Sequence, residues 1–346
     1  MFSGLIRYFM IFLNWINSWV GNYGWSIVIF TLLIRLILLP LDIKSKKSMR
    51  AMSKIQPQMA ALQAKYANDR DKMNQKLSEL YKKEHVSPMS GCLPMLIQFP
   101  ILIIMFNAMR YVGNERTIQM ILDMKETGAL QPGALQGWLW IKNVFQPDSF
   151  AATILPAVGD PLRLIQAVSH SSILTAENIE TARTFLASDA YNAIAVNYAP
   201  ASAFLTTKLN LLFFAPTLTL PTSLANLFRY SNGLFILPLL AGFSQFFMTK
   251  IMNGKQEKEK KDKNALPTVQ EKEASAAADA ANAMNSPVMK WFFPIFSIYI
   301  CATSNAAFSI YWMAANVIQI VQQLFVNAWF ERQDAKASAP TEAPKP

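Results

Sequence analysis

Long apolar runs alternate with polar stretches along this chain, and the apolar runs are long enough to cross a membrane as helices. About 30 Å of hydrocarbon requires about 20 residues of helix. The pattern predicts five spans, at residues 22–43, 89–110, 233–252, 288–304 and 305–330. The second contains Pro94 and Pro100 and the fourth contains Pro294, so we expect distorted helices whose freed carbonyls find partners inside a bundle. The expected fold class is therefore an all-α integral membrane protein.

Residues 1–21 predict an amphipathic helix that lies in the membrane interface. Large apolar side chains recur there at helical spacing, at Leu5, Phe9, Phe12, Ile16 and Trp19, as an interfacial helix requires. No small-x-small cleavage site follows them, so we expect the segment to be retained. A tilted additional span is the alternative.

Residues 44–88 predict a helical hairpin on the cytoplasmic side. Two apolar series with helical period flank Asn68 and Asp69; they comprise Met52, Ile55, Met59, Leu62 and Tyr66, then Met73, Leu77, Leu80 and Tyr81. The stretch has a large excess of lysine and arginine, which places it in the cytoplasm. The alternative is a solvated pair of charged helices that only connects two spans.

The remaining polar segments agree with this orientation. Residues 253–287 form a second lysine-rich loop and residues 331–346 a flexible tail, both expected in the cytoplasm. Five spans then place the N-terminus outside and the C-terminus inside. Residues 111–232 contain few basic residues, balanced by acids, and are expected to be extracytoplasmic.

Composition supports a membrane protein and excludes several other classes. The chain is 52% hydrophobic and 16% charged, which excludes an ordinary soluble globule. Its net charge of +10 accumulates beside apolar segments, which favours contact with anionic lipid headgroups over direct nucleic-acid readout. Cys92, Cys301, His85 and His170 lack the spacing of a metal or redox site. We therefore expect no metal, cofactor or catalytic residue, and no enzyme.

Arg35 is a charge inside the otherwise apolar first span. An arginine near the middle of a bilayer helix costs about 3 kcal/mol on insertion scales, so it usually faces a bundle interior or a watery cavity. No acidic residue lies mid-span, and Asp42 stands at the edge of the first one. We therefore expect Arg35 to face a wet cavity and to attract acidic groups from outside the protein. Snorkelling to the headgroups and carbonyls freed by the span prolines are the alternatives.

A polar stripe runs along the last span. Ser309, Trp312, Asn316, Gln319 and Gln323 are three or four residues apart, so they share one helical face. Hydrogen bonding between helices is the alternative explanation for any one of them. With polar residues from the other spans, the predicted polar groove comprises Arg35, Thr31, Gln98, Gln245, Ser297, Ser309, Trp312, Asn316 and Gln319.

Three stretches of sequence carry a resemblance to a known family. They are NYGWSIVIFTLLIRLILLPL, the hairpin and second span ending SGCLPMLIQFPILIIMF, and FSIYWMAANVIQIVQQ. They resemble the YidC, Oxa and Alb family of membrane protein insertases, of the type found in Gram-positive bacteria. Arg35 falls where that family keeps its groove arginine.

The resemblance implies five transmembrane helices around a hydrophilic groove that opens to the cytoplasm and to lipid but is closed outside. It implies an insertase and chaperone for nascent membrane proteins in the bacterial plasma membrane, working alone or with the Sec translocon and ribosome–nascent chain complexes. The chain departs from the family in an insertion at residues 157–230 and in a tail that is not strongly basic, which weakens the case for ribosome binding by the tail.

Two other function classes remain open from the sequence. A small-anion transporter or channel would use Arg35 as its anion site and would need a pathway open alternately to both sides. A purely structural chaperone would help other spans pack without inserting them.

Overall fold

The structure is a computed structural model that describes residues 3–66, 68–85, 93–156, 165–166, 168, 171–208, 217–261 and 287–338. Most of the predicted loop 253–287, the end of the tail 331–346 and parts of the insertion 157–230 lie outside these residues.

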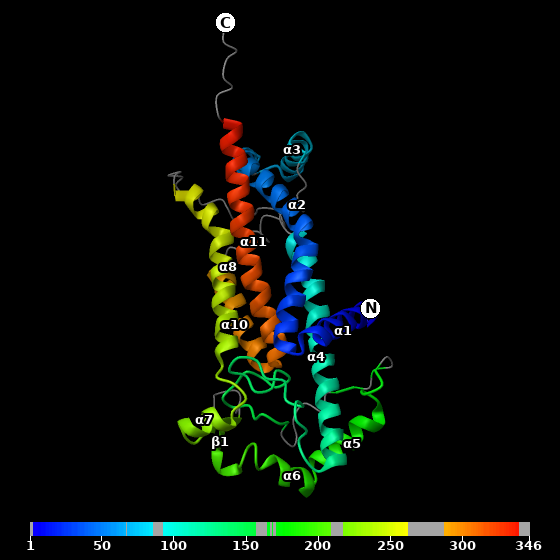
Figure 1. Ribbon diagram of the computed structural model, residues 1–346. Coiled ribbons are helices and arrows are strands. Elements are labelled where there is room, and N and C mark those ends of the chain that lie inside the picture. Colours follow the sequence, from blue (N-terminus) through cyan, green and yellow to red (C-terminus); the bar gives the residue numbers. More distant parts are fainter. Residues whose placement is uncertain are drawn as a thin grey trace. The chain divides into compact units, whose positions relative to one another are not determined.

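The described chain is mostly helical (Figure 1). The longer helices are α1 (Ser3–Val20), α2 (Tyr23–Lys65), α3 (Arg70–Lys83), α4 (Leu93–Thr127), α8 (Ile236–Lys261), α10 (Pro287–Thr303) and α11 (Ala306–Ser338). The shorter elements are α5 (Ala176–Leu186), α6 (Asp189–Ala195), the 3-10 turn η3 (Ala201–Ala203), β1 (Phe204–Lys208), β2 (Thr217–Pro221) and α7 (Leu224–Tyr230). This architecture agrees with the expected helical fold class.

One short sheet departs from the helical pattern. Strands β1 and β2 pair antiparallel, with Phe204 opposite Pro221 and Lys208 opposite Thr217. Threonine alternates with leucine along β2, and β-branched residues favour a pleated surface. This pair of strands was not predicted from the sequence.

One helical stretch of the described chain, Tyr23–Met52, is both long and apolar enough to cross a membrane. Two shorter apolar stretches are Ile236–Met248 and Trp291–Thr303. The number of spans therefore remains a prediction.

Helix α2 continues without a break from the predicted first span into the predicted hairpin. It has 43 residues, with Pro40 and Pro57 inside it. Helix α3 then starts at an N-cap, where the Asp69 carboxylate accepts a hydrogen bond of 3.0 Å from the Lys72 backbone N–H. Its buried side chains are Met73, Leu77 and Leu80, which all belong to the second apolar series of the sequence.

The chain forms two compact units. The first unit comprises Met1–Leu33, Ile101–Phe246 and Phe292–Ala315. The second unit comprises Ile34–Pro100, Phe247–Trp291 and Asn316–Pro346.

Helix α1 carries apolar side chains on two faces. One face is buried and comprises Ile6, Met10, Leu13 and Ile16. Beside it, the rings of Phe9 and Phe12 contact the Phe30 ring, with centroids 5.6 and 5.5 Å apart. The other face is exposed and comprises Tyr8, Ile11, Trp15 and Trp19. Exposed aromatic side chains suit a helix in the membrane interface, but this location remains a prediction.

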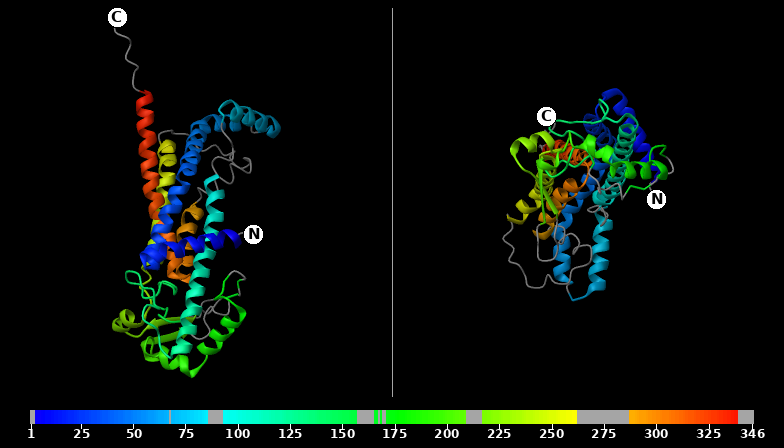
Figure 2. Two further views of the ribbon diagram at one scale, coloured as in Figure 1. Left: turned by 45° about the vertical axis from the view of Figure 1, so that its right-hand side comes forward. Right: turned by 90° about the horizontal axis from the view of Figure 1, so that it is seen from below.

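The C-terminal turns of α4 support a small core that includes residues of the insertion. Helix α4 continues past the predicted span to Thr127, and its residues from Ile118 to Met124 pack with α5 and α6 (Figure 2). The buried members of this core are Ile118, Met120, Ile121, Met124, Leu155, Ile165, Leu174, Ile179, Ala182, Phe185, Leu186 and Tyr191. The insertion thus builds part of a folded subdomain.

Two buried asparagines join the segments on either side of the insertion. The Asn232 side chain accepts a hydrogen bond from the Asn143 backbone N–H and donates one to the Asn143 carbonyl, each 2.9 Å long. An antiparallel bridge pairs Thr153 with Ser231. Because its ends are tied together, the insertion does not separate the segment before it from α8.

Asp148 anchors the start of α8. Its buried carboxylate accepts hydrogen bonds from the backbone N–H groups of Leu234 (2.8 Å), Phe235 (3.2 Å) and Leu237 (2.6 Å), and from the indole of Trp140. The first N–H groups of a helix have no partner within it, and a carboxylate there also interacts favourably with the helix dipole.

Gly242 allows α8 to approach α10 closely within the first unit. A Cβ atom on Gly242 would lie 2.4 Å from Ile298 Cγ1 and 3.1 Å from the Pro294 carbonyl oxygen. We expect Gly242→Ala to lower the free energy of unfolding by about 1–2 kcal/mol, because the overlap outweighs alanine's better helix propensity. Denaturant titration in mixed micelles measures this change. Gly4→Ala is the matched control, since a Cβ there meets nothing within 4 Å, and an equal loss in both variants would contradict the packing argument.

Candidate functional site

Arg35 is buried in α2, within the second unit, with only 5% of its surface exposed. Its Nη2 atom donates a hydrogen bond of 3.1 Å to Oε1 of Gln319 on α11. The structure therefore brings together two residues that the sequence analysis placed in one groove. The neutral amide orients the guanidinium without adding a charge of its own.

Gln322 makes a second link between the same two helices, which the sequence analysis missed. Its Nε2 atom donates a hydrogen bond of 3.2 Å to the Arg35 backbone carbonyl. Gln323, which the predicted stripe included, instead bonds within α11 to Asn327. Both Gln322 and Gln323 lie one helical turn beyond Gln319, so a step of three residues instead of four would have found Gln322.

Asn316 lies one turn before Gln319 on α11 and is also buried. Both belong to the second unit together with Arg35. Gln98 lies in α4 of the same unit, but its side chain is outside the described part of the chain.

The predicted hydroxyl residues bond to backbone carbonyls in the first unit. Thr31 donates to the Ile27 carbonyl (2.6 Å) and Ser297 to the Phe293 carbonyl (2.8 Å), each within its own helix. Ser309 of α11 donates to the Cys301 carbonyl of α10 (3.0 Å). All three side chains are buried and have partners. Only the Ser309 bond joins two helices, so it alone fits the alternative of hydrogen bonding between helices.

Trp312 differs from these hydroxyls. Its ring contacts Phe308 at a centroid distance of 5.5 Å, while its indole N–H is buried and meets no acceptor among the described residues. A buried donor without an acceptor costs about 1–3 kcal/mol. Gln245, on α8 in the same unit, is half-buried.

The structure therefore joins part of the predicted set. Arg35 and Gln319 are bonded to each other in the second unit, whereas Thr31, Gln245, Ser297, Ser309 and Trp312 belong to the first unit. A single groove formed by all of these residues remains a prediction.

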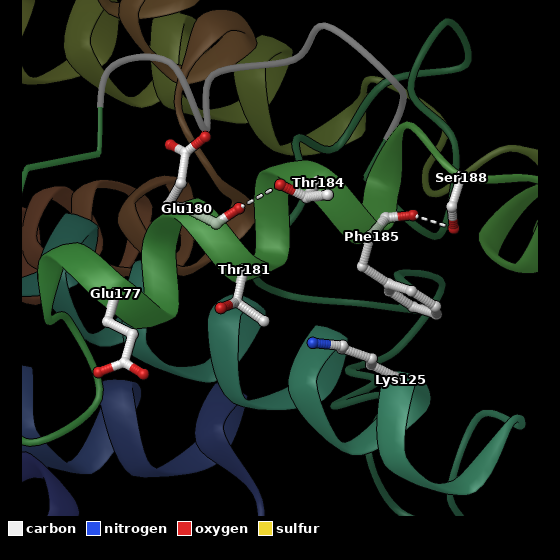
Figure 3. Close-up of a pocket in the computed structure, with 7 residues that line it drawn as sticks. All are labelled: Lys125, Glu177, Glu180, Thr181, Thr184, Phe185 and Ser188. Carbon is white, nitrogen blue, oxygen red and sulfur yellow. Dashed lines mark hydrogen bonds between the residues drawn. The ribbon is translucent and has the colours of Figure 1, made fainter.

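A separate pocket of about 540 Å³ lies between the end of α4 and the helix α5 (Figure 3). It contains none of the predicted groove residues. Within it, the hydroxyls of Thr184 and Ser188 donate to backbone carbonyls of Glu180 and Phe185. Its lining residues are Lys125, Glu177, Glu180, Thr181, Thr184, Phe185 and Ser188. No feature of this pocket indicates a ligand.

The family is decided by comparison with known proteins. A family model described as the 60Kd inner membrane protein matches residues 15–334. The chain belongs to this family. The match covers α2 and α11 up to residue 334, and therefore includes Arg35, Gln319 and Gln322. It confirms the resemblance to the YidC, Oxa and Alb insertases.

Curated members related to this chain have the name membrane protein insertase YidC. The protein from Fusobacterium nucleatum is 48% identical over 107 residues, which cover 31% of this chain and 52% of the relative. The protein from Chlorobaculum parvum is 36% identical over 168 residues, covering 48% and 26% respectively. The protein from Thioalkalivibrio sulfidiphilus is 44% identical over 132 residues, covering 38% and 24%. The chain thus matches about half of the first relative and about a quarter of the other two.

Proposed function

We propose that this chain is a membrane protein insertase and chaperone that inserts nascent membrane proteins into a bacterial plasma membrane and helps them fold. The observation that carries the proposal is the guanidinium of Arg35, buried in an apolar helix and oriented by Gln319. A buried charge at such a position is expensive, so it usually serves a function. Family membership and the names of the relatives support the same activity.

In the proposed mechanism, the charged helices of the cytoplasmic hairpin first contact the nascent chain. Its polar N-terminal tail then enters the groove, where Arg35 attracts acidic residues of the tail. Gln98, Trp312 and Asn316 keep the tail hydrated. The indole N–H of Trp312, which meets no acceptor among the described residues, supports this role. The groove shortens the apolar barrier that the tail has to cross.

The driving force comes from the substrate. Its apolar helix moves into lipid, which contributes about 25 cal/mol per Å² of buried apolar surface, and the membrane potential acts on acidic tails. Neither step requires ATP.

The proposed setting is a plasma membrane of the Gram-positive type, with five spans, the N-terminus outside and the C-terminus in the cytoplasm. The proposed partners are nascent membrane proteins, anionic lipid, the Sec translocon and ribosome–nascent chain complexes. The groove is proposed to open to the cytoplasm and to lipid and to be closed outside.

Reconstitution of the purified chain tests the function directly. We expect vesicles that contain the protein to insert a single-span substrate with a translocated tail, as measured by protease protection of that tail, well above protein-free vesicles. Absence of insertion despite correctly oriented protein would contradict an insertase and leave the structural chaperone.

The rival anion transporter predicts a different result in the same vesicles. It would release trapped small anions, and single cysteines introduced at positions 31, 35 and 316 would react with water-soluble reagents from both faces. The insertase groove predicts no anion release and reaction from the cytoplasmic face alone.

A further inference from the structure

Helix α7 exposes apolar side chains although its ends are firmly held. None of its seven residues is buried, and a helix this short is not stable alone in water. Leu224 and Phe228, one helical turn apart, have 75% and 64% of their surfaces exposed. Because both lie on the same side of α7, they present an exposed apolar face, and an apolar partner would remove it from water.

Polar contacts fix the position of α7. At its start, the Ser223 hydroxyl accepts a hydrogen bond of 3.2 Å from the Asn226 backbone N–H. At its end, the Lys142 amine donates to the carbonyls of Phe228 (2.8 Å) and Ser231 (2.9 Å). A cation at the last carbonyls is favourable for the helix dipole. The apolar face is therefore held in a set orientation.

The connection to α8 places α7 near one end of that helix. Only residues 231–235 separate Tyr230 from Ile236, and this length spans roughly 20 Å at most. The connection is tied down as well, because Ser231 donates to the Phe150 carbonyl (2.8 Å) and the Asn232 N–H donates to the Ala152 carbonyl (2.8 Å). Figure 1 shows α7 at the end of α8 where that helix begins.

The charge around α7 favours an anionic partner. From Ala190 to Ile236 the sequence contains Lys208 and Arg229 and no Asp or Glu. Arg229 is exposed and directly follows Phe228 in α7. An exposed apolar face flanked by a cation is the arrangement by which a helix lies on an anionic bilayer surface.

We propose that α7 is an interfacial anchor, with Leu224 and Phe228 at the extracytoplasmic boundary between headgroups and acyl chains and Arg229 on anionic phospholipid headgroups. The inference rests on the proposed function, because it requires α8 to enter the membrane near Ile236. Such an anchor would give the insertion 157–230 a role: it would hold the subdomain built by α4, α5 and α6 against the bilayer.

Spin-label accessibility in vesicles tests the anchor. The full chain with Cys92→Ser, which retains the buried Cys301, receives single cysteines as Leu224→Cys or Phe228→Cys. Leu240→Cys, on the exposed apolar side of α8, is the reference for lipid, and Glu177→Cys, at an exposed position of α5, is the reference for water. Gel filtration and circular dichroism verify that each variant is folded.

We expect the ratio of oxygen to nickel-chelate relaxation at positions 224 and 228 to exceed that at position 177 several-fold and to approach that at position 240. The same ratio at 224 and 228, but not at 240, is expected to rise when phosphatidylglycerol is added to phosphatidylcholine vesicles. Arg229→Gln is expected to remove this increase.

Each result that contradicts the anchor differs from the others and identifies which part of the proposal fails. Water-like ratios at 224 and 228 with a lipid-like ratio at 240 would overturn the anchor and leave the proposed function intact. A water-like ratio at 240 would overturn the proposed membrane placement and the anchor together. Protection of 224 and 228 from both reagents, with spin–spin broadening that vanishes on dilution with unlabelled protein, would identify a second copy as the partner. Equal ratios in both lipid mixtures would overturn the role of anionic headgroups.

Discussion

Replacing Asp148 with alanine is expected to lower the free energy of unfolding by about 3–5 kcal/mol, because it leaves several buried donors without an acceptor. The Asp148 carboxylate accepts hydrogen bonds from three backbone N–H groups at the start of α8 and from the indole of Trp140. The Asp148 side chain is fully buried, so bulk water cannot replace the lost acceptor without local opening of the fold. Denaturant titration in mixed micelles measures the change in the free energy of unfolding. Gel filtration first removes oligomers, so that every variant is compared in the same state of association.

Two variants separate this role from a general effect of charge removal. Asp148→Asn retains one acceptor oxygen and is expected to lose less stability than alanine. Asp123→Ala removes a carboxylate that accepts one hydrogen bond from Gln119 within α4, and we expect a change below about 1 kcal/mol. Equal losses at positions 148 and 123 would contradict the anchoring of α8 by Asp148. Gly233→Ala should resemble Asp148→Ala, since its Cβ would lie 2.0 Å from Asp148 Oδ1.

Replacing Arg35 with alanine is expected to reduce insertion of substrates with acidic tails roughly tenfold, since one charge–charge contact at about 4 Å contributes about 1–4 kcal/mol. Substrates with neutral tails are expected to insert almost normally, because they gain little from the guanidinium. Protease protection in reconstituted vesicles, with the two tail types on one transmembrane segment, measures the difference.

The choice of substitution and control identifies what Arg35 contributes. Arg35→Lys should retain much of the activity if the charge matters, and little if the geometry held by Gln319 matters. Arg110→Ala is the matched control, an exposed arginine of α4 outside the predicted groove. An equal loss for acidic and neutral tails in Arg35→Ala would contradict charge attraction and favour a structural role.

Local pattern predicted much of the helical framework. The apolar series at Met73, Leu77 and Leu80 is buried in α3, because periodic side chains on one face of a helix select that face for packing. The polar stripe placed Gln319 in the same candidate set as Arg35, and these two residues, far apart in the sequence, are hydrogen-bonded in the structure. The stripe did not lead to Gln322, because one helical face admits steps of three or four residues and only the facing helix decides between them.

Contacts distant in sequence could not be predicted in the same way. The turns of α4 between Ile118 and Met124 pack with residues beyond position 170. The pairing of Asn143 with Asn232 spans 89 residues. Neither the periodicity nor the composition of one segment identifies its distant partner. The insertion therefore remained without an interpretation until its core and its joined ends were seen.

The sequence by itself determined the helical class, the family resemblance and the cost of placing Arg35 in an apolar helix, because composition, periodicity and burial energies are local properties. Only the tertiary structure decided which polar groups form hydrogen bonds with one another. It bonds Arg35 to Gln319 and Gln322, gives Asp148 the free N–H groups at the start of α8, and leaves the Trp312 indole without an acceptor among the described residues. The physical reason is that hydrogen bonds depend on distances and directions between segments, which are fixed when the chain packs.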